Sequence, residues 1–227
     1  MGWKSILSIF KDKRELLDPH RFDDEIAPRV DWTPLVGGGS SFCTHRPQTK
    51  QTLTTSTLTF KTTATAFLFC GMFVCIGLTW IIGFVIPHAA AGGGMDGGAS
   101  LIPIGFVLFG WWYAWQLRRK EITFDRDGGL ARTADSELRL SDLHAIQLIR
   151  EYVRDSKNSY YSYELNLITK DLYRWNVIDH GNLRAIRIDA KVLGDYLGIP
   201  VWDAIDFRIP DPSNGEFLKA TTLNQNR

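Results

Sequence analysis

Two long apolar stretches in the middle of this chain constrain its fold more than any other feature. They cover Ala66–Ile86 and Leu101–Leu117, and neither contains a charged side chain. A bilayer core about 30 Å thick needs roughly 17–25 apolar residues in helical form, so each stretch is long enough to cross it. The sequence therefore predicts a two-helix transmembrane hairpin over residues 62–120, with the glycine-rich connector His88–Ser100 between the helices.

The positions of the basic residues predict how this hairpin is oriented. Lys50 and Lys61 precede the first stretch and three cations follow the second, whereas the connector contains neither Lys nor Arg. Basic residues concentrate on the cytoplasmic side of membrane proteins, so both termini are predicted to be cytoplasmic. Aromatic residues before the exit form a predicted interfacial belt. The membrane-interface residues are then Trp111, Trp112, Tyr113, Trp115, Arg118, Arg119 and Lys120.

The remainder of the 227-residue chain divides unequally around the hairpin. Residues 1–61 form a predicted N-terminal cytoplasmic segment with a short amphipathic helix and a strand, too short to fold alone. Residues 121–203 are long enough for one small cytoplasmic domain, and residues 204–227 read as a polar tail. The formal net charge of +1 gives no general affinity for nucleic acid.

After the hairpin the apolar side chains change to a two-residue period, which predicts strands. Asp127-Gly128-Gly129 supplies a tight turn between the first two strands. Along Tyr160–Thr169 the alternation separates an apolar face from a polar face, and the polar face, with Ser162, Glu164 and Asn166, is predicted to be exposed. The predicted strands are Gln51–Thr62, Glu121–Phe124, Leu130–Thr133, Leu143–Val153, Tyr160–Thr169 and Leu172–Ile178.

The last predicted element is an amphipathic helix. Its apolar residues recur at spacings of three and four from Leu183 to Leu197, the pattern of one buried helical face. Asn182 can cap its start and Gly198 its end. The predicted fold class is α+β: a transmembrane hairpin followed by an antiparallel β-sheet or partial barrel that a C-terminal helix covers.

This order of elements resembles the bacterial PH-like (pleckstrin-homology-type) membrane proteins. The resemblance lies in the two spans, the charged exit, the strand–turn–strand Ile122–Leu130 (ITFDRDGGL) and the final helix. It covers about Glu121–Trp202 and the hairpin, and leaves the N-terminal segment unassigned. It implies a cytoplasmic PH-like domain suspended from a hairpin in a bacterial inner membrane.

The residue types needed for catalysis occur without the spacing that catalysis requires. A G-x-S-x-G nucleophile turn is missing, and no two His or Cys residues have metal-ligand spacing. The two spans contain no ionisable Asp, Glu, Lys, Arg or His, which argues against a transporter or pump. The sequence therefore predicts a non-enzymatic protein without cofactor or metal. Small residues in the spans are predicted to pack the hairpin on itself: Gly71, Gly77, Gly83, Gly105 and Gly110.

Binding of a protein partner, in a scaffold or regulatory role, is the function that this pattern favours. Aromatic residues are enriched at binding hot spots, and the candidates here are Tyr160, Tyr161, Tyr163, Tyr173 and Trp175. One alternative is a membrane-anchored immunity-type inhibitor of a toxin. Another is an accessory module for lipid headgroups, which would use the cations Arg150, Arg154 and Lys157. Membrane lipids and a protein are the expected partners, and a homo-oligomer is compatible with the sequence.

Overall fold

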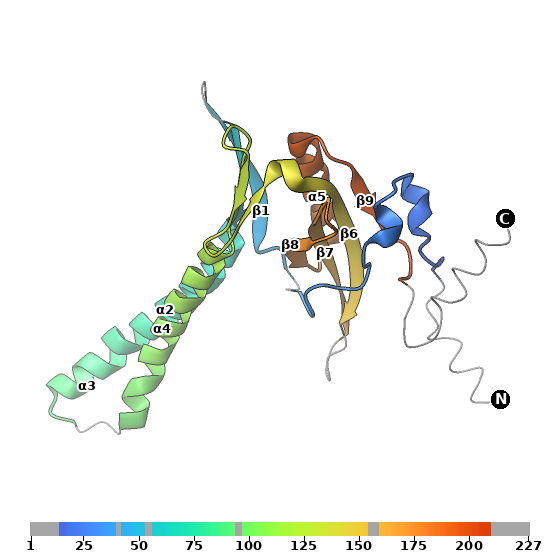
Figure 1. The fold of residues 1–227 in the computed structure, drawn as a ribbon. Coiled ribbons are helices and arrows are strands. Elements are labelled where there is room, and N and C mark those ends of the chain that lie inside the picture. Colours follow the sequence, from blue (N-terminus) through green and yellow to red (C-terminus); the bar gives the residue numbers. More distant parts are fainter. Residues whose placement is uncertain (1–13, 40–41, 53–55, 94–96, 154–158, 210–227) are drawn as a thin grey trace, which may run out of the picture. The chain divides into compact units, whose positions relative to one another are not determined.

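The computed structural model describes residues 14–39, 42–52, 56–93, 97–153 and 159–209, with residues 97–100 as backbone. The fold is α+β with antiparallel sheets, as the sequence predicts (Figure 1). The chain divides into two compact units: unit 1 combines Met1–Ser41 with Asp142–Arg227, and unit 2 is Phe42–Ser141. Unit 2 is therefore inserted into the sequence of unit 1.

Unit 2 contains a five-stranded antiparallel meander in the order β1-β2-β3-β4-β5. The single strand predicted over Gln51–Thr62 is instead part of a two-stranded ribbon, because the preceding residues from His45 also pair. Alternate side chains of β2 and β3, such as Phe60 and Phe124, are fully buried. The strands are β1 (His45–Gln51), β2 (Ser56–Thr62), β3 (Ile122–Asp125), β4 (Leu130–Arg132) and β5 (Glu137–Arg139).

A helical hairpin connects β2 to β3. Its first arm contains α2 (Ala64–Trp80), the π-helical turn η3 (Ile81–Val85) and α3 (Ile86–Ala90). Pro87 has no backbone N–H to give to the helical ladder, which accounts for the irregular turn before it. The second arm is α4 (Gly97–Arg119). Among the described residues, one stretch is long and apolar enough to cross a membrane: Ala64–Ala90, with only 11% of its most apolar window buried.

Two of the five glycines in the apolar stretches bring the helices together. A Cβ on Gly77 would lie 2.5 Å from the Pro103 carbonyl oxygen, and one on Gly110 would lie 2.7 Å from the Cys70 carbonyl oxygen. These two positions therefore require glycine for close packing of α2 on α4. The prediction was wrong for the other three glycines. A Cβ placed on Gly71, Gly83 or Gly105 would have no atom of the opposite helix within 4 Å, so these residues do not contact that helix.

The hairpin is connected directly to two neighbouring strands, β2 before it and β3 after it. Strand β2 ends at Thr62 and pairs with β3, with Phe60 opposite Ile122. The Thr62 backbone N–H donates to the Glu121 carboxylate at 3.0 Å, and His45 Nε2 lies 2.9 Å from the Leu117 carbonyl oxygen. The end of α4 is thus bound to β1, and the last residue of β2 is bound to the residue that precedes β3.

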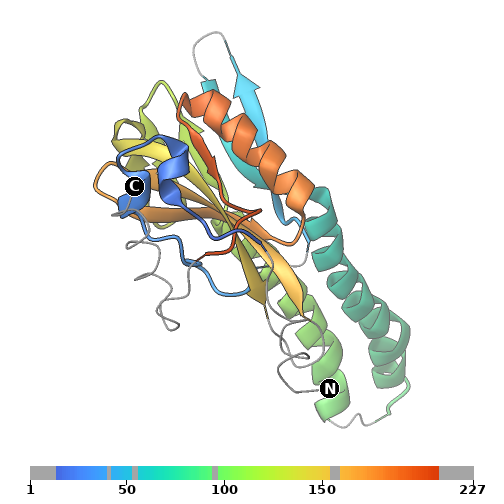
Figure 2. The ribbon, with the colours of Figure 1, turned by 90° about the vertical axis from the view of Figure 1, so that its right-hand side faces the viewer.

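Unit 1 is built on a second sheet, in the order β8-β7-β6-β9, in which the short β9 runs parallel to β6. Its strands are β6 (Leu143–Val153), β7 (Tyr160–Thr169), β8 (Arg174–His180) and β9 (Val201–Asp203). Helix α5 (Leu183–Leu197) packs on one face (Figure 2). The predicted bounds of this helix are confirmed: the Asn182 side chain accepts from the Ala185 N–H, and Gly198 ends the helix with a φ of 72°.

The N-terminal segment covers the opposite face of the same sheet. It contains the short helices η1 (Pro19–Phe22) and η2 (Ala27–Arg29). Trp32 and Trp202 lie at the centre of the resulting core, with ring centroids 6.0 Å apart. The other buried members are Leu17, Ala27, Val30, Ala145, Ile149, Ile168 and Ala204. Residues 14–39 of the predicted N-terminal segment therefore belong to unit 1, whereas residues 42–61 belong to unit 2. The short amphipathic helix predicted at the start of the chain lies within residues 1–13, outside the described residues.

Two boundaries differ from the sequence prediction. The strands predicted as one domain over residues 121–203 fall in two sheets, because β3 pairs with β2 from before the hairpin. The predicted polar tail begins too early: Ala204 and Ile205 are fully buried, and Leu16 forms a bridge with Arg208. Periodicity along the sequence identifies strands but not the partners with which they pair.

Candidate functional site

A row of polar side chains lies on the sheet face beneath the N-terminal segment. Gln147, Ser162, Glu164 and Asn166 are all fully buried. The predicted alternation along β7 is confirmed, but the predicted exposure of its polar face is wrong. Residues 31–39, which we call the strap, lie over this face and exclude water from it. A buried polar row of this kind needs hydrogen-bond partners, and the strap provides many of them.

The sheet holds the strap mainly through its backbone. The two carboxylate oxygens of Glu164 accept from the backbone N–H groups of Leu35 and Val36, each at 2.9 Å. Glu151 accepts from the Gly38 N–H at 2.9 Å. The Leu35 and Val36 side chains are 44% and 39% exposed, so this contact recognises peptide groups. Further bonds reach strap carbonyl oxygens from Gln147 (3.0 Å), Arg174 (2.6 Å) and Tyr160 (2.8 Å).

Glu164 and Arg174 are buried, oppositely charged groups, and Arg174 also pairs with Asp31, which is exposed. Burial raises the pKa of Glu164, and the hydrogen bonds from Leu35, Asn166 and Val36, together with the nearby Arg174, oppose that rise without cancelling it. Burial likewise lowers the pKa of Arg174, whose guanidinium lies 3.3 Å from the Asp31 carboxylate. An Asn176–Asn166 hydrogen bond of 2.9 Å extends the network to β8. The arrangement can hold an extended peptide backbone, which here belongs to the same chain.

A second feature is an exposed aromatic cluster on the opposite side of β6 and β7. Tyr152 and Tyr161 are directly opposed cross-strand partners, with ring centroids 5.2 Å apart. The Arg150 guanidinium lies 4.3 Å from the centroid of the Tyr161 ring. The two tyrosines are 50% and 44% exposed. We call Arg150, Tyr152 and Tyr161 the tyrosine patch.

The structure brings together only part of the predicted partner-binding set. Tyr161 belongs to the tyrosine patch, whereas Tyr163 is buried at 7% exposure and Tyr160 binds the strap. Tyr173 is 58% exposed at the other end of β7, and Trp175 on β8 is half-buried. The sequence analysis did not select Tyr152. Its position near the end of the predicted strand Leu143–Val153, which precedes the tyrosine-rich strand, could have indicated it.

Of the three residues predicted to contact lipid headgroups, the structure describes only Arg150. Arg150 stacks on an aromatic ring in the tyrosine patch, which stabilises a cation by the electrostatics of the ring face. Arg154 and Lys157 lie outside the described residues. The described part of this candidate set therefore contributes to an aromatic surface.

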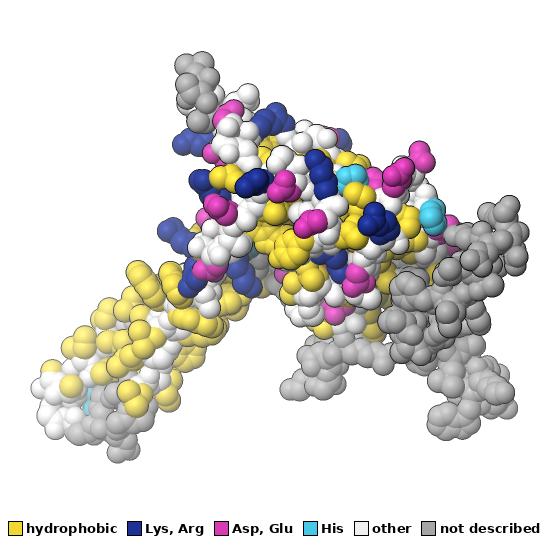
Figure 3. Space-filling model, in the orientation of Figure 1, with side chains coloured by type: hydrophobic (Ala, Val, Ile, Leu, Met, Phe, Trp, Pro, Cys, Tyr) yellow, Lys and Arg dark blue, Asp and Glu magenta, His cyan; other side chains and the backbone are white. Residues whose placement is uncertain are grey.

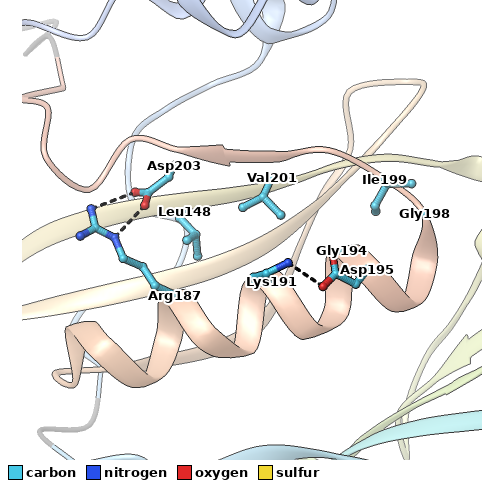
Figure 4. Close-up of a pocket in the computed structure, with 9 residues that line it drawn as sticks. All are labelled: Leu148, Arg187, Lys191, Gly194, Asp195, Gly198, Ile199, Val201 and Asp203. Atoms are coloured by element: carbon cyan, nitrogen blue, oxygen red, sulfur yellow. Dashed lines mark hydrogen bonds and ion pairs between the residues drawn. The ribbon is translucent and has the colours of Figure 1, made fainter.

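A shallow pocket of about 550 Å³ runs between α5 and β9 (Figure 4). Both cations in its lining are paired: Arg187 lies 2.7 Å from the Asp203 carboxylate, and Lys191 lies 2.8 Å from that of Asp195. Hydrogen bonds and charge from Asp203 and Asp206, against the effect of burial, raise the pKa of Arg187. The Arg187–Asp203 pair joins α5 to β9, whereas Lys191 and Asp195 are an exposed pair one turn apart within α5.

The predicted membrane-interface residues gather at one end of the helical hairpin. Trp111 is 76% exposed, and Trp112 and Trp115 are each 50% exposed. Tyr113 differs, because its ring packs between α2 and α4, 6.2 Å from Phe69 and 5.9 Å from Phe109 between centroids. Arg118 and Arg119 end α4, and Lys120 follows them before β3 begins.

Comparison of the chain with protein-family models, with curated proteins and with solved structures finds no match.

Proposed function

We propose that this chain is a non-enzymatic, membrane-anchored binding protein. In this proposal the helical hairpin crosses a bilayer as two spans, and unit 1 binds a protein partner on the cytoplasmic side through the tyrosine patch. The observation that carries the proposal is the pairing of an exposed apolar hairpin with an exposed Tyr/Arg cluster on a separate sheet.

The surface of the hairpin supports a membrane anchor. Large apolar side chains cover both arms and face outward (Figure 3). A continuous apolar surface of this kind is costly in water and marks contact with lipid or with another protein. The exposed members include Leu68, Met72, Ile82, Phe84, Ile86, Leu101, Ile102, Ile104 and Leu108. The exposed tryptophans before Arg118 occupy the place expected of an interfacial belt.

We also propose that the strands and α5 form a PH-like arrangement in a bacterial inner-membrane protein. The order within unit 1 supports it: the antiparallel strands β6, β7 and β8 come first, and the amphipathic helix α5 follows them. This remains an analogy at the level of fold, and the partner-binding role is argued from the side chains instead.

The composition of the tyrosine patch favours a protein partner. Tyrosine and arginine are the residue types enriched at binding hot spots, since they bury large areas and keep polar ends for hydrogen bonds. In the patch the aromatic rings are preassembled across two strands, so little side-chain entropy is lost on binding.

The test is quantitative co-purification of the full-length protein in mild detergent. The double variant Tyr152→Ser/Tyr161→Ser is expected to lose a stoichiometric partner that the parent retains, with binding weakened at least tenfold. Tyr173→Ser is a control, because it removes an exposed tyrosine from the turn between β7 and β8, outside the tyrosine patch. Equal retention by all three proteins would refute the patch as the binding surface, and the identity of the partner would separate a scaffold from a toxin inhibitor.

A further inference from the structure

The sheet of unit 1 carries a set of side chains that bind the backbone of an extended segment. They come from three neighbouring strands, β6, β7 and β8, and each forms a hydrogen bond with a backbone N–H or C=O group of the strap. Only Arg174 also binds a strap side chain, the Asp31 carboxylate. We call this set the peptide floor: Gln147, Glu151, Tyr160, Glu164 and Arg174.

The chemistry of the peptide floor is costly for a segment that does nothing but cover a core. The carboxylate of Glu164 is fully buried, whereas the Leu35 and Val36 side chains of the strap are exposed. Burial of a charge costs free energy, and an apolar contact of similar size is often as stable or more stable. A permanent cover would therefore be expected to bury its own apolar side chains. The observed contact suits a segment that can be exchanged.

The strap also leaves part of the buried surface beneath it without hydrogen bonds. Ser162 is fully buried, and its hydroxyl has no hydrogen-bond partner among the described residues. The Nε atom of Arg174 is likewise buried and has no partner in the described part of the chain. Buried polar atoms are nearly always paired, so each of these atoms needs an explanation. An occupant that bonded them would make contacts that the strap does not make.

The backbone of the strap shows which peptides would fit. The floor accepts hydrogen bonds from the N–H groups of Leu35, Val36 and Gly38, which excludes proline at these three positions. Gly38 has a φ of 74°, a conformation that favours glycine. A Cβ on Gly39 would lie 2.1 Å from the Ser162 hydroxyl oxygen. The fitting segment therefore has two residues other than proline, a spacer, and then two glycines.

We propose that the peptide floor is a second binding site of unit 1, which takes an extended, glycine-containing segment of a different protein in place of the strap. The tyrosine patch lies on the opposite face of the sheet, and the proposal depends neither on that patch nor on the membrane anchor. A second copy of this chain is a poorer donor. Exchange of straps would reproduce the same contacts and would lose the freedom of two separate molecules. A foreign segment can gain the bonds that Ser162 and Arg174 lack.

The experiment uses full-length protein in mild detergent and a fluorescently labelled peptide with the sequence of residues 31–39, DWTPLVGGG. The variant Gly39→Val should open the strap, because its side chain would collide with Ser162 and Asp179. Gly37→Val is the matched control, since a Cβ at that position has no atom within 4 Å. Fluorescence anisotropy should show the peptide binding about tenfold or more tightly to Gly39→Val than to the parent or the control, because the tethered strap competes.

Two further changes test the contacts themselves. A peptide with proline at the positions of Leu35 and Val36 lacks the two N–H groups that Glu164 accepts, and it should bind Gly39→Val about tenfold more weakly or worse. The double variant Gly39→Val/Glu164→Gln should lose a similar factor for the original peptide. Equal binding of the two peptides would overturn the proposal, and so would a Gly39→Val protein that exposes its strap to hydrogen exchange but binds no peptide.

The parent protein decides the matter if Gly39→Val fails to fold or keeps its strap closed. Unlabelled peptide at about 1–5 mM should displace the parent's own strap and speed hydrogen exchange at its Leu35 and Val36 amides, whereas the proline peptide should not. Unchanged exchange would overturn the proposal. Light scattering tests the remaining occupant: a parent that forms dimers by exchanging straps would assign the peptide floor to a second copy and would also overturn it.

Discussion

Glu164 connects the strap to the sheet through a single carboxylate. Its two oxygens serve two consecutive peptide N–H groups, a geometry that a carboxylate provides and an amide side chain does not. The burial of this charge costs free energy, and the hydrogen bonds from the strap and Asn166 recover part of it. The residue therefore couples the position of the strap to the ionisation of a buried group.

The variant Glu164→Gln is expected to loosen the strap. Its amide nitrogen would face a peptide N–H, which leaves one donor without an acceptor and lowers the local opening free energy by about 1–3 kcal/mol. Hydrogen exchange over residues 31–39 measures this effect at the Leu35 and Val36 amides. Glu151→Gln is the control, because Glu151 binds only the Gly38 N–H of the strap in the described contacts. Unchanged exchange at Leu35 and Val36 in the Glu164 variant would contradict the assignment.

The raised pKa of Glu164 also predicts a dependence on pH. In the window between the ordinary value of 4.5 and the raised folded value, the folded chain binds more protons at this group than the unfolded chain. The contribution of Glu164 to stability therefore decreases as pH rises through that window. Denaturant titrations across it should show a flatter pH profile for Glu164→Gln than for the parent.

At the scale of the elements, the two arms of the hairpin approach each other at glycines on α2 and α4. A methyl group at Gly77 would collide with the backbone at Pro103, whereas Gly71 on the same helix has open space around it. Close approach at such positions increases contact between the helix backbones. The separation of the arms is thus determined by the absence of a side chain at two residues.

We expect Gly77→Ala to destabilise the hairpin by about 1–3 kcal/mol, because the helices must shift apart. Gly71→Ala should be neutral or stabilising by up to about 1 kcal/mol, since alanine loses less backbone entropy in a helix. Thermal unfolding of the full-length protein in detergent compares the two. A Gly77 variant as stable as the Gly71 variant would show that the arms do not pack at this position.

The elements that sequence predicts well are those whose pattern is local. Helix α5 carries its apolar face, its Asn182 cap and its Gly198 end within seventeen residues, and β6 and β7 have the predicted bounds. The strap and β9 were missed because their partners are distant in sequence. The burial of Glu164 depends on residues 35 and 36, more than 120 positions away, and no periodicity in β7 contains that information.

At the scale of the whole molecule, the proposed anchor predicts the side of the membrane on which each region lies. With Cys43, Cys70 and Cys75 replaced by Ala, single cysteines introduced at Ala91 or Arg139 report on the connector and on the sheet. A membrane-impermeant maleimide applied to intact cells lacking the outer membrane should label Ala91→Cys, and Arg139→Cys only after lysis. Labelling of both before lysis would refute the two-span arrangement, and the reverse pattern would invert the orientation.

The insertion of unit 2 into unit 1 has a consequence for biosynthesis. The strap leaves the ribosome first, and the sheet that it covers follows roughly 100 residues later, after about 5–20 s of translation at usual rates. During that interval both arms of the hairpin are made, while Trp32 and the strap still lack the strands against which they pack. The core of unit 1 therefore forms only after the hairpin has been synthesised, so the proposed insertion of the hairpin into a membrane can begin before unit 1 is complete.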